Sequence, residues 1–299
     1  MEVGAETRNQ RLETGSWKLE VGSKFQHPTS YFLPRTPYPR NAGHIERYVM
    51  SSRQRRTVLI TGASSGIGYE LAKLFARDGD DLVLVARDLE RLRRVADDLT
   101  NQYHVSVNVI AKDLTSPIAA GEIAAQLQHE RIRISALVNN AGFGTYGPFA
   151  KADLAMEEGM MQVNMVSLTQ LTRLLLPDLL RAGEGYVLNV ASTAAFQPGP
   201  LMAVYYASKA YVLSFSEALA NELRGTGVSV TALCPGPTRT AFQERARMRQ
   251  ARLVSGRIMD AATVARIGYR GLFQRRPVVI PGLRNQGLAW LARLVPRAC

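Results

Sequence analysis

The sequence has few cysteines and lacks any long apolar run. Its 299 residues include two cysteines, Cys234 and Cys299, which are too few for a disulfide framework and indicate a reducing compartment. No run of about 18 apolar residues is present, so the sequence predicts no membrane-spanning helix. The N-terminus also lacks the apolar core of a signal peptide. Metal-ligand spacing is absent among the four histidines, His27, His44, His104 and His129. We therefore expect a cytoplasmic protein without a metal site.

Acidic residues are scarce near the C-terminus, and the chain as a whole carries a net charge of +12. Residues 239–299 hold 13 of the 37 Lys and Arg residues and 2 of the 25 Asp and Glu residues, whereas residues 57–238 are mildly acidic. No recognisable nucleic-acid-binding module accompanies the basic ends, so we expect no nucleic-acid partner. A solvated surface, an acidic substrate carrier and an anionic membrane surface remain alternative explanations for the basic tail.

Residues 1–49 have little apolar periodicity and contain closely spaced prolines at 34–39. Proline removes a backbone donor and disfavours both helix and central strand. We expect this segment to be an extension that is disordered or reflects a misassigned start, with Met50 as the alternative first residue. The predicted domain covers residues 50–299, and its core covers residues 57–282.

From residue 57 onward, short apolar runs alternate with amphipathic stretches. The apolar runs predict strands at 58–60, 82–85, 105–110, 136–138, 185–190, 228–233 and 278–280. The amphipathic stretches predict a first helix that ends near 77 and further helices at about 89–100, 117–129, 153–180 and 204–223. Apolar strands that alternate with helices indicate a parallel sheet covered on both faces. We therefore predict an α/β fold with a doubly wound, Rossmann-like parallel sheet in a single domain.

A glycine-rich turn, Thr61-Gly62-Ala63-Ser64-Ser65-Gly66-Ile67-Gly68, follows the first predicted strand and opens a helix. Glycines let backbone N–H groups approach a pyrophosphate, and the helix N-terminus adds positive charge. The G-x-x-x-G-x-G spacing is slightly longer than the usual dinucleotide fingerprint. The sequence therefore predicts dinucleotide contacts from Gly62, Ser64, Ser65, Gly66, Ile67 and Gly68.

Arg87 follows the second predicted strand, where an acidic residue would bind the ribose 2′-hydroxyl of NAD. A guanidinium can instead pair bidentately with a 2′-phosphate. We therefore predict NADP(H) as the cofactor. The adjacent Asp88 weakens this preference if its carboxylate, rather than Arg87, faces the ribose.

From about Thr57 to at least Thr240, an ordered series of motifs resembles the short-chain dehydrogenase/reductase family. After the glycine-rich turn, the motifs are Asp113-Leu114, Asn139-Asn140-Ala141-Gly142, Asn164, Ser192, Tyr205-x-x-x-Lys209, Pro235-Gly236 and Thr240. The resemblance implies cofactor contacts from Asp113, Leu114, Asn140, Ala141, Gly142, Tyr205, Lys209, Pro235, Gly236, Thr238 and Thr240. It also implies a homodimer or homotetramer joined through the two long helices. In finer detail the chain looks like NADP-preferring bacterial reductases of unassigned substrate.

Tyr205 and Lys209 lie four residues apart on a predicted helix and therefore share one face. Hydride transfer to a carbonyl builds negative charge on its oxygen, so a proton donor is required. A phenol has a pKa near 10, and a neighbouring ammonium lowers that pKa. We expect Tyr205 to be the general acid and base, with Lys209 lowering its pKa. The resemblance adds Ser192 as a donor to the substrate oxygen and Asn164 as part of a proton relay with Lys209.

Aromatic and apolar residues are frequent in segments 143–150, 193–203 and 238–262, which are expected to wall the substrate pocket. They are Phe143, Tyr146, Phe149, Phe196, Met202 and Phe242. We therefore expect a small-molecule carbonyl or alcohol substrate of hydrophobic character, with ordinary loop packing as the alternative explanation. The apolar stretch 288–295 is expected either to cover the sheet edge or to make weak contact with a membrane surface.

Two functions from different classes fit these observations. The first is an NADPH-dependent oxidoreductase that moves a hydride between nicotinamide and a carbonyl or alcohol carbon. The second is an NADP(H)-binding regulatory or scaffold protein without significant turnover. The presence of all four residues, Asn164, Ser192, Tyr205 and Lys209, favours the enzyme, because a scaffold need not retain them.

Overall fold

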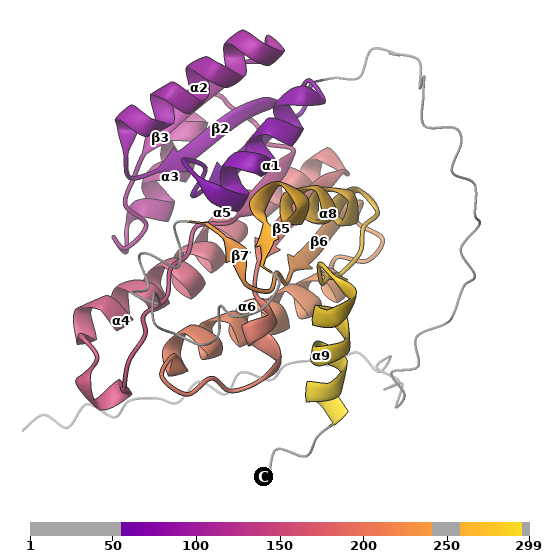
Figure 1. Cartoon of the computed structure of the whole chain (residues 1–299). Coiled ribbons are helices and arrows are strands. Elements are labelled where there is room, and N and C mark those ends of the chain that lie inside the picture. Colours follow the sequence, from indigo (N-terminus) through magenta and orange to yellow (C-terminus); the bar gives the residue numbers. More distant parts are fainter. Residues whose placement is uncertain (1–54, 241–257, 295–299) are drawn as a thin grey trace, which may run out of the picture. The chain divides into compact units, whose positions relative to one another are not determined.

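The computed structural model describes residues 55–240 and 258–294. Within them, seven strands form one parallel sheet in the order β3-β2-β1-β4-β5-β6-β9 (Figure 1). The strands are β1 (Thr57–Thr61), β2 (Asp81–Ala86), β3 (Val107–Ala111), β4 (Ala136–Asn139), β5 (Gly185–Val190), β6 (Val228–Leu233) and β9 (Val278–Val279). A second, two-stranded sheet pairs β7 (Thr238–Arg239) with β8 (Met259–Asp260). The predicted doubly wound parallel sheet is confirmed.

Helices cover both faces of the large sheet. Residues of α1, α2 and α8 pack in one core cluster, and residues of α3, α5 and the end of α6 pack in another. The described helices are α1 (Gly66–Arg77), α2 (Leu89–Tyr103), α3 (Ala119–His129), α4 (Leu154–Met161), α5 (Leu168–Ala182), α6 (Ala203–Glu222), α8 (Ala261–Phe273) and α9 (Leu283–Leu294). The strand order reverses between β1 and β4, which opens a crevice beyond the carboxyl ends of the strands.

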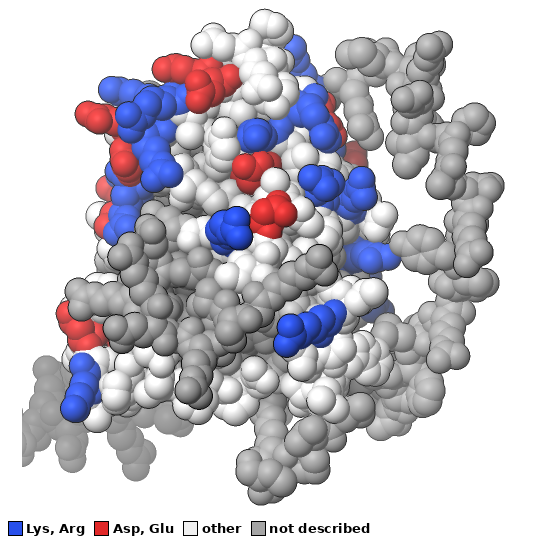
Figure 2. Space-filling model, viewed as in Figure 1, with Lys and Arg blue, Asp and Glu red and all other residues white. Residues whose placement is uncertain are grey.

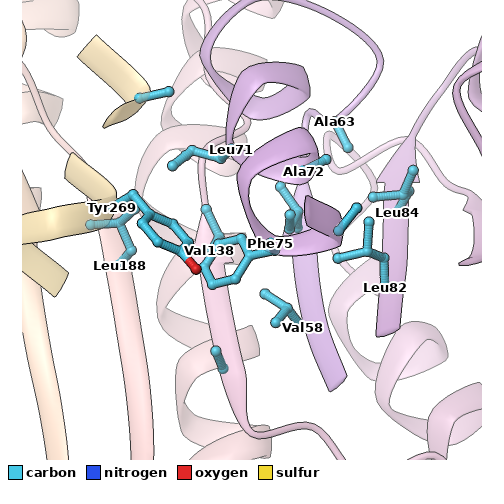
Figure 3. Packing of buried hydrophobic residues seen from close by; sticks show 14 of the residues in the cluster. Val58, Ala63, Leu71, Ala72, Phe75, Leu82, Leu84, Val138, Leu188 and Tyr269 are labelled. Atoms are coloured by element: carbon cyan, nitrogen blue, oxygen red, sulfur yellow. The ribbon is translucent and has the colours of Figure 1, made fainter. Parts of the chain in front are cut away.

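The strands are apolar on both sides because each side faces a helical layer. Along β1, Val58 and Ile60 belong to the cluster with α1, whereas Leu59 belongs to the cluster with α3 and α5. Figure 3 shows Phe75 of α1 between strand residues such as Val138 and the ring of Tyr269 on α8. The ring centroids of Phe75 and Tyr269 lie 4.9 Å apart in an edge-on arrangement. These contacts fix the helix that begins at the glycine-rich turn.

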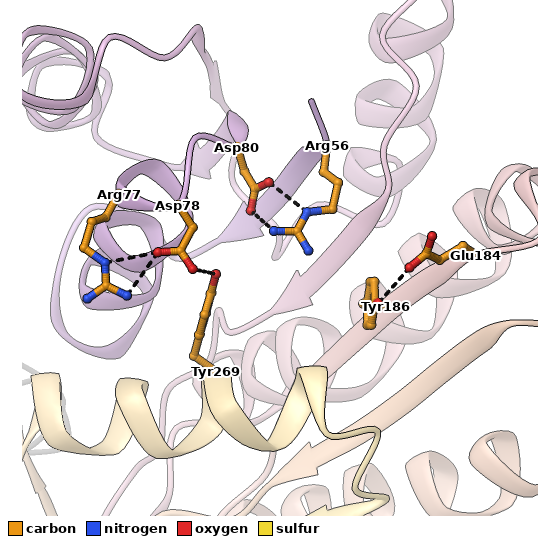
Figure 4. A network of polar contacts seen from close by, with 7 residues as sticks. All are labelled: Arg56, Arg77, Asp78, Asp80, Glu184, Tyr186 and Tyr269. Carbon is orange, nitrogen blue, oxygen red and sulfur yellow. Dashed lines mark hydrogen bonds and ion pairs between the residues drawn. The ribbon is translucent and has the colours of Figure 1, made fainter. Parts of the chain in front are cut away.

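Polar contacts lie at the amino ends of β1 and β2, away from the crevice (Figure 4). They attach α8 and the start of β1 to the loop after α1. The Tyr269 hydroxyl donates to Asp78 Oδ2 at 2.7 Å. Arg56 donates to both carboxylate oxygens of the buried Asp80, at 2.8 and 2.7 Å. Bidentate pairing of this kind satisfies a buried charge. The network therefore fixes the position of the start of β1 relative to the end of α1.

Phe75→Ala is expected to lower the free energy of unfolding by about 3–5 kcal/mol, because it leaves a cavity between α1, α8 and the sheet. Phe75 is fully buried. Phe149→Ala is the matched control, since Phe149 is 68% exposed and surface substitutions change stability by about 0.5 kcal/mol or less. Urea denaturation measures both. A loss below about 1 kcal/mol for Phe75→Ala contradicts the packing described.

The structure differs from the sequence prediction in several elements, including the short strands β7 and β8, which were not predicted. The helix predicted at 153–180 is interrupted, because residues Gln162–Ser167 form a π-helical turn between α4 and α5. The strand predicted at 105–110 begins two residues later, at Val107. The predictions named no helix at 261–273 or 283–294, yet α8 and α9 lie there. The predicted extension 1–49 lies outside the described residues.

None of the helices in the described part of the chain combines the length and the apolar character that crossing a bilayer requires.

Candidate active site

A cavity of about 680 Å³ opens at the carboxyl ends of the strands. Its walls bring together most of the residues that the sequence analysis selected from widely separated segments. These are Gly62, Ser64, Ser65, Gly66, Ile67, Arg87, Asp113, Leu114, Asn140, Ala141, Gly142, Ser192, Tyr205, Lys209, Pro235, Gly236, Thr238 and Thr240. Gly68 and Asn164 do not line the cavity and support it from behind.

The glycine-rich turn has backbone geometry that side chains would obstruct. Gly62 has φ +65°, and a Cβ there would lie 2.8 Å from Asn140 Nδ2. At Gly68, a Cβ would lie 2.4 Å from the same nitrogen and 2.5 Å from the Gly62 carbonyl oxygen. Only glycine leaves room at these two positions. The turn therefore keeps its backbone bare at the N-terminus of α1, where phosphate binding is favoured.

Asn140 and Thr61 hold the glycine-rich turn against the end of β4. Asn140 Nδ2 donates to the carbonyl oxygens of Thr61 and Gly62 at 2.9 and 3.2 Å. The Thr61 hydroxyl oxygen accepts the backbone N–H groups of Asn140 and Ala141, both at 3.0 Å. Asn140, which the resemblance placed among the cofactor contacts, thus also shapes the turn. The sequence analysis assigned no role to Thr61.

Arg87 and Asp113 lie at the end of the cavity formed by β2 and β3. Arg87 Nη1 lies 3.9 Å from Asp113 Oδ2, and both side chains are about half exposed. Asp88 instead caps α2, because its Oδ1 accepts the backbone N–H of Arg91 at 3.0 Å. Asp88 nevertheless lines the cavity together with Arg87 and Asp113, so the guanidinium of Arg87 lies there with two carboxylates.

Ser192 and Tyr205 place two hydroxyl groups on one side of the cavity. Ser192 follows β5 and begins a short 3-10 helix (Thr193–Phe196), where its oxygen accepts the Ala194 N–H at 3.1 Å. Tyr205 lies in the first turn of α6. A hydrogen bond joins the Ser192 and Tyr205 side chains, and it opposes the effect of burial on the pKa of Tyr205.

Lys209 lies one helical turn after Tyr205 and is buried. Its Nζ donates to the Val190 carbonyl oxygen at 2.9 Å and lies 5.9 Å from the centroid of the Tyr205 ring. A Cβ on Gly142 would lie 3.3 Å from this nitrogen. The predicted sharing of one helix face by the phenol and the amine is therefore present in the structure.

The pKa of Tyr205 is shifted upward, in the direction opposite to the lowering expected from Lys209. Burial raises the pKa of Tyr205 to about 12, and the hydrogen bond with Ser192 only partly opposes this. Burial likewise lowers the pKa of Lys209 to about 8. Burial is therefore the largest effect on the pKa of both groups, because each lies where its charged form is poorly solvated.

Asn164 lies in the π-helical turn, where the wider winding directs its amide toward the loop after β4. Its Nδ2 donates to the Phe143 carbonyl oxygen and to Ser208 Oγ, both at 3.0 Å. Its Oδ1 accepts the Phe143 N–H at 3.2 Å. Ser208 in turn donates to the Tyr205 carbonyl oxygen at 2.7 Å. The sequence analysis treated Ser208 as a packing residue, yet it connects Asn164 to the helix that carries Tyr205.

Part of the predicted substrate wall is present, and α9 adds a part that was missed. Phe143, Phe196 and Met202 line the cavity, whereas the partly exposed Tyr146 and the largely exposed Phe149 do not. Phe242 lies outside the described residues. Four α9 residues also line the cavity: Asn285, Leu288, Ala289 and Ala292. The helical spacing of these residues in an apolar stretch was the signal from which this helix could have been predicted.

The cavity fits the nicotinamide dinucleotide that the resemblance implies. The bare glycine-rich turn is a cradle that a Cβ at Gly62 or Gly68 would fill. Arg87 supplies a cation at one end of the cavity, and the Tyr205 hydroxyl and the Lys209 amine lie together at the other. These groups match the diphosphate, a ribose and the reacting ring of a nicotinamide dinucleotide.

Comparison with known proteins identifies similar proteins in the family that the motifs resemble. The family model for short chain dehydrogenases matches residues 56–251. A sulfoacetaldehyde reductase from Chromohalobacter salexigens is 41% identical over 62% of this chain and 73% of that protein. A very-long-chain 3-oxoacyl-CoA reductase from Anas platyrhynchos is 35% identical over 59% of this chain and 58% of that protein.

Solved structures extend the likeness to most of the chain. A short-chain dehydrogenase from Sphingobium yanoikuyae in complex with NADPH has a TM-score of 0.71 and 34% identity, covering 82% of this chain and 98% of that one. A family member from Burkholderia phymatum in complex with NAD has a TM-score of 0.71 and 25% identity, covering 79% and 92%. The chain belongs to the short-chain dehydrogenase/reductase family of oxidoreductases.

Proposed function

We propose that this protein is an NADPH-dependent reductase that transfers a hydride to the carbonyl carbon of a hydrophobic small molecule, with Tyr205 as the general acid. The observation that carries the proposal is the hydrogen-bonded pair of Ser192 and Tyr205 in the cavity wall, with the buried Lys209 one turn behind it. These residues supply two donors to one oxygen and a cation next to the phenol, which is the arrangement that carbonyl reduction requires.

Each residue has a distinct role in the proposed reaction. The bound cofactor supplies the hydride. The Ser192 and Tyr205 hydroxyls hold the substrate oxygen, and Tyr205 gives its proton as charge develops there. Lys209 would bind the adjacent ribose hydroxyls and would stabilise the phenolate that remains. Asn164 and Ser208 hold the Phe143 loop and α6 in place. Asn164 would also complete a proton relay with Lys209 through water.

The raised pKa of Tyr205 suits this residue to the proposed role of proton donor. With its pKa raised to about 12, the phenol is protonated at neutral pH, which is the form that donates to an alkoxide in carbonyl reduction.

The proposal is tested by incubating the full chain with NADPH and a panel of aldehydes and ketones, and by following absorbance at the reduced-nicotinamide band. Turnover of hydrophobic carbonyl compounds, absent in Tyr205→Phe, supports it. Binding of NADPH without turnover of any panel member supports the alternative, a regulatory or scaffold protein. The four residues Asn164, Ser192, Tyr205 and Lys209 favour the enzyme, because their contacts serve no evident purpose in a scaffold.

Arg87→Asp is expected to shift the ratio of NADPH to NADH affinity toward NADH by at least tenfold. The guanidinium would pair with the 2′-phosphate, and a charge-assisted pair is worth about 1.5–3 kcal/mol. An aspartate at 87 repels that phosphate. Fluorescence titration with both cofactors measures the ratio. Arg91→Asp, one turn into α2, is the control, and an unchanged ratio in Arg87→Asp removes Arg87 from this role.

We also propose a homo-oligomer joined through α5 and α6. Large apolar side chains are exposed on these helices and on the π-helical turn, at Val166, Leu174 and Tyr211. Tyr211 stacks on Phe215 and hydrogen-bonds Thr169, so the exposed surface joins both helices. Light scattering of the full chain tests the assembly, and Leu174→Glu is expected to shift it to the monomer.

A further inference from the structure

Helix α9 has two apolar faces with different surroundings. The inner face carries Leu288, Ala289 and Ala292 and lines the cavity, with Ala289 buried and Leu288 still 56% exposed. The outer face carries Leu283, Trp290 and Leu291, which are 85%, 62% and 57% exposed and do not line the cavity. At 100° per residue these three side chains occupy one arc of the helix. A solvated helix rarely places a tryptophan and several leucines in water.

A basic residue borders this outer face, and acidic residues are absent from the segment. Arg284 falls on one side of the apolar arc. Residues 261–299 contain seven arginines and neither Asp nor Glu. On the face of the molecule drawn in Figure 2, the described atoms around α9 are blue and white. A partner that supplies negative charge together with an apolar surface therefore complements this face.

We propose that the outer face of α9 binds the surface of an anionic lipid bilayer, lying in the interface rather than crossing it. An apolar arc bordered by an arginine in a strongly basic segment, with a tryptophan at its edge, is the pattern of helices that lie in the bilayer interface. A second copy of this chain fits less well. A symmetric pairing through α9 would bring two segments together that are both basic, with no acidic residue in either to neutralise Arg284.

The inner face of α9 is held against the rest of the protein, which leaves the outer face for contact with lipid. Asn285 Nδ2 donates to the Pro281 carbonyl oxygen at 2.7 Å, and the same side chain lies over Gly236, where a Cβ would come within 2.6 Å of it. The helix is thus seated on the loop after β6 by its inner face. Docking through the outer face leaves these inner contacts in place and puts one wall of the cavity at the lipid surface.

Flotation of the full chain with phosphatidylcholine vesicles, with and without phosphatidylglycerol, tests the proposal. We expect flotation with the anionic vesicles that falls with added salt, and at least a tenfold smaller bound fraction for the double variant Trp290→Gln/Leu291→Gln. The double variant Ile118→Gln/Leu154→Gln, which removes exposed apolar residues on other helices, is expected to float like the wild type. NADPH titration and thermal melts show that both variants are folded.

Three outcomes overturn the proposal. The first is absence of flotation with anionic vesicles, and the second is equal flotation of the α9 variant and the wild type. The third is a lower assembly mass of the α9 variant in light scattering without loss of flotation, which assigns the face to a second copy. None of these outcomes depends on turnover, so failure here leaves the proposed reductase function intact.

Discussion

Tyr205→Phe is expected to reduce kcat/KM for carbonyl reduction by about 10²- to 10⁴-fold, the range that removal of a general acid produces. The substitution removes one oxygen from the wall of the cavity and leaves the ring, so the glycine-rich turn, Arg87 and Lys209 keep their positions. The affinity for NADPH should therefore change little. Steady-state kinetics with a substrate identified from the panel, together with fluorescence titration of NADPH, measure both quantities.

The neighbouring tyrosine provides the matched control. Tyr206 packs its ring against Gly199, where a Cβ would lie 2.3 Å from Tyr206 Cδ2, and meets the Tyr205 ring edge-on at 6.0 Å. Its hydroxyl has no part in the proposed proton transfer, so Tyr206→Phe should retain most of the activity. If Tyr205→Phe keeps substantial turnover while Tyr206→Phe loses it, the proton donor has been assigned to the wrong residue.

Between pH 8 and pH 10 the free energy of unfolding of the wild type is expected to rise, relative to that of Lys209→Met, by on the order of 2 kcal/mol. Burial lowers the pKa of Lys209 to about 8 from its ordinary value of 10.5. In this window the unfolded chain keeps the lysine proton and the folded protein has released it. At this group the unfolded state therefore binds more protons, and its contribution to stability increases with pH. Tyrosines with raised pKa values act in the opposite sense, but they are the same in both proteins.

Urea denaturation of wild type and Lys209→Met at pH 8 and pH 10 measures this difference. Lys151→Met, on the protein surface, is the control and should keep the rise with pH. The same Lys209 variant should lose carbonyl reduction. An equal change of stability with pH in the wild type and in Lys209→Met shows that the ammonium is better solvated than its burial and its hydrogen bond to Val190 indicate.

The local pattern of the sequence was enough to place the strands, the glycine-rich turn and most of the cavity-lining residues. Each depends on neighbours within one element or on motif order, such as the apolar run 82–85 or the four-residue spacing of Tyr205 and Lys209. The π-helical turn was not foreseeable in this way. Its wider winding serves contacts of Asn164 with Phe143 and Ser208, residues 21 and 44 positions away.

The pKa of Tyr205 was predicted in the wrong direction for a similar reason. Spacing along the helix indicates that a phenol and an amine share a face, but it does not indicate how much water surrounds them. Burial from other parts of the chain controls both groups, as the shifts of Tyr205 and Lys209 show. The role of Ser208 and the seating of α9 on Gly236 likewise depend on contacts between segments that only the folded chain brings together.

Because of the position of α9, substitutions that change the shape of the cavity can be made separately from substitutions that change proton transfer. None of the residues proposed for proton transfer lies on this helix, yet Leu288 and Ala292 form part of the cavity wall. Exchanging these two side chains can therefore alter which molecules fit without disturbing the proton donor or the phosphate cradle. Divergence of substrate range among descendants of this chain, and its redesign in the laboratory, can begin at positions 288 and 292.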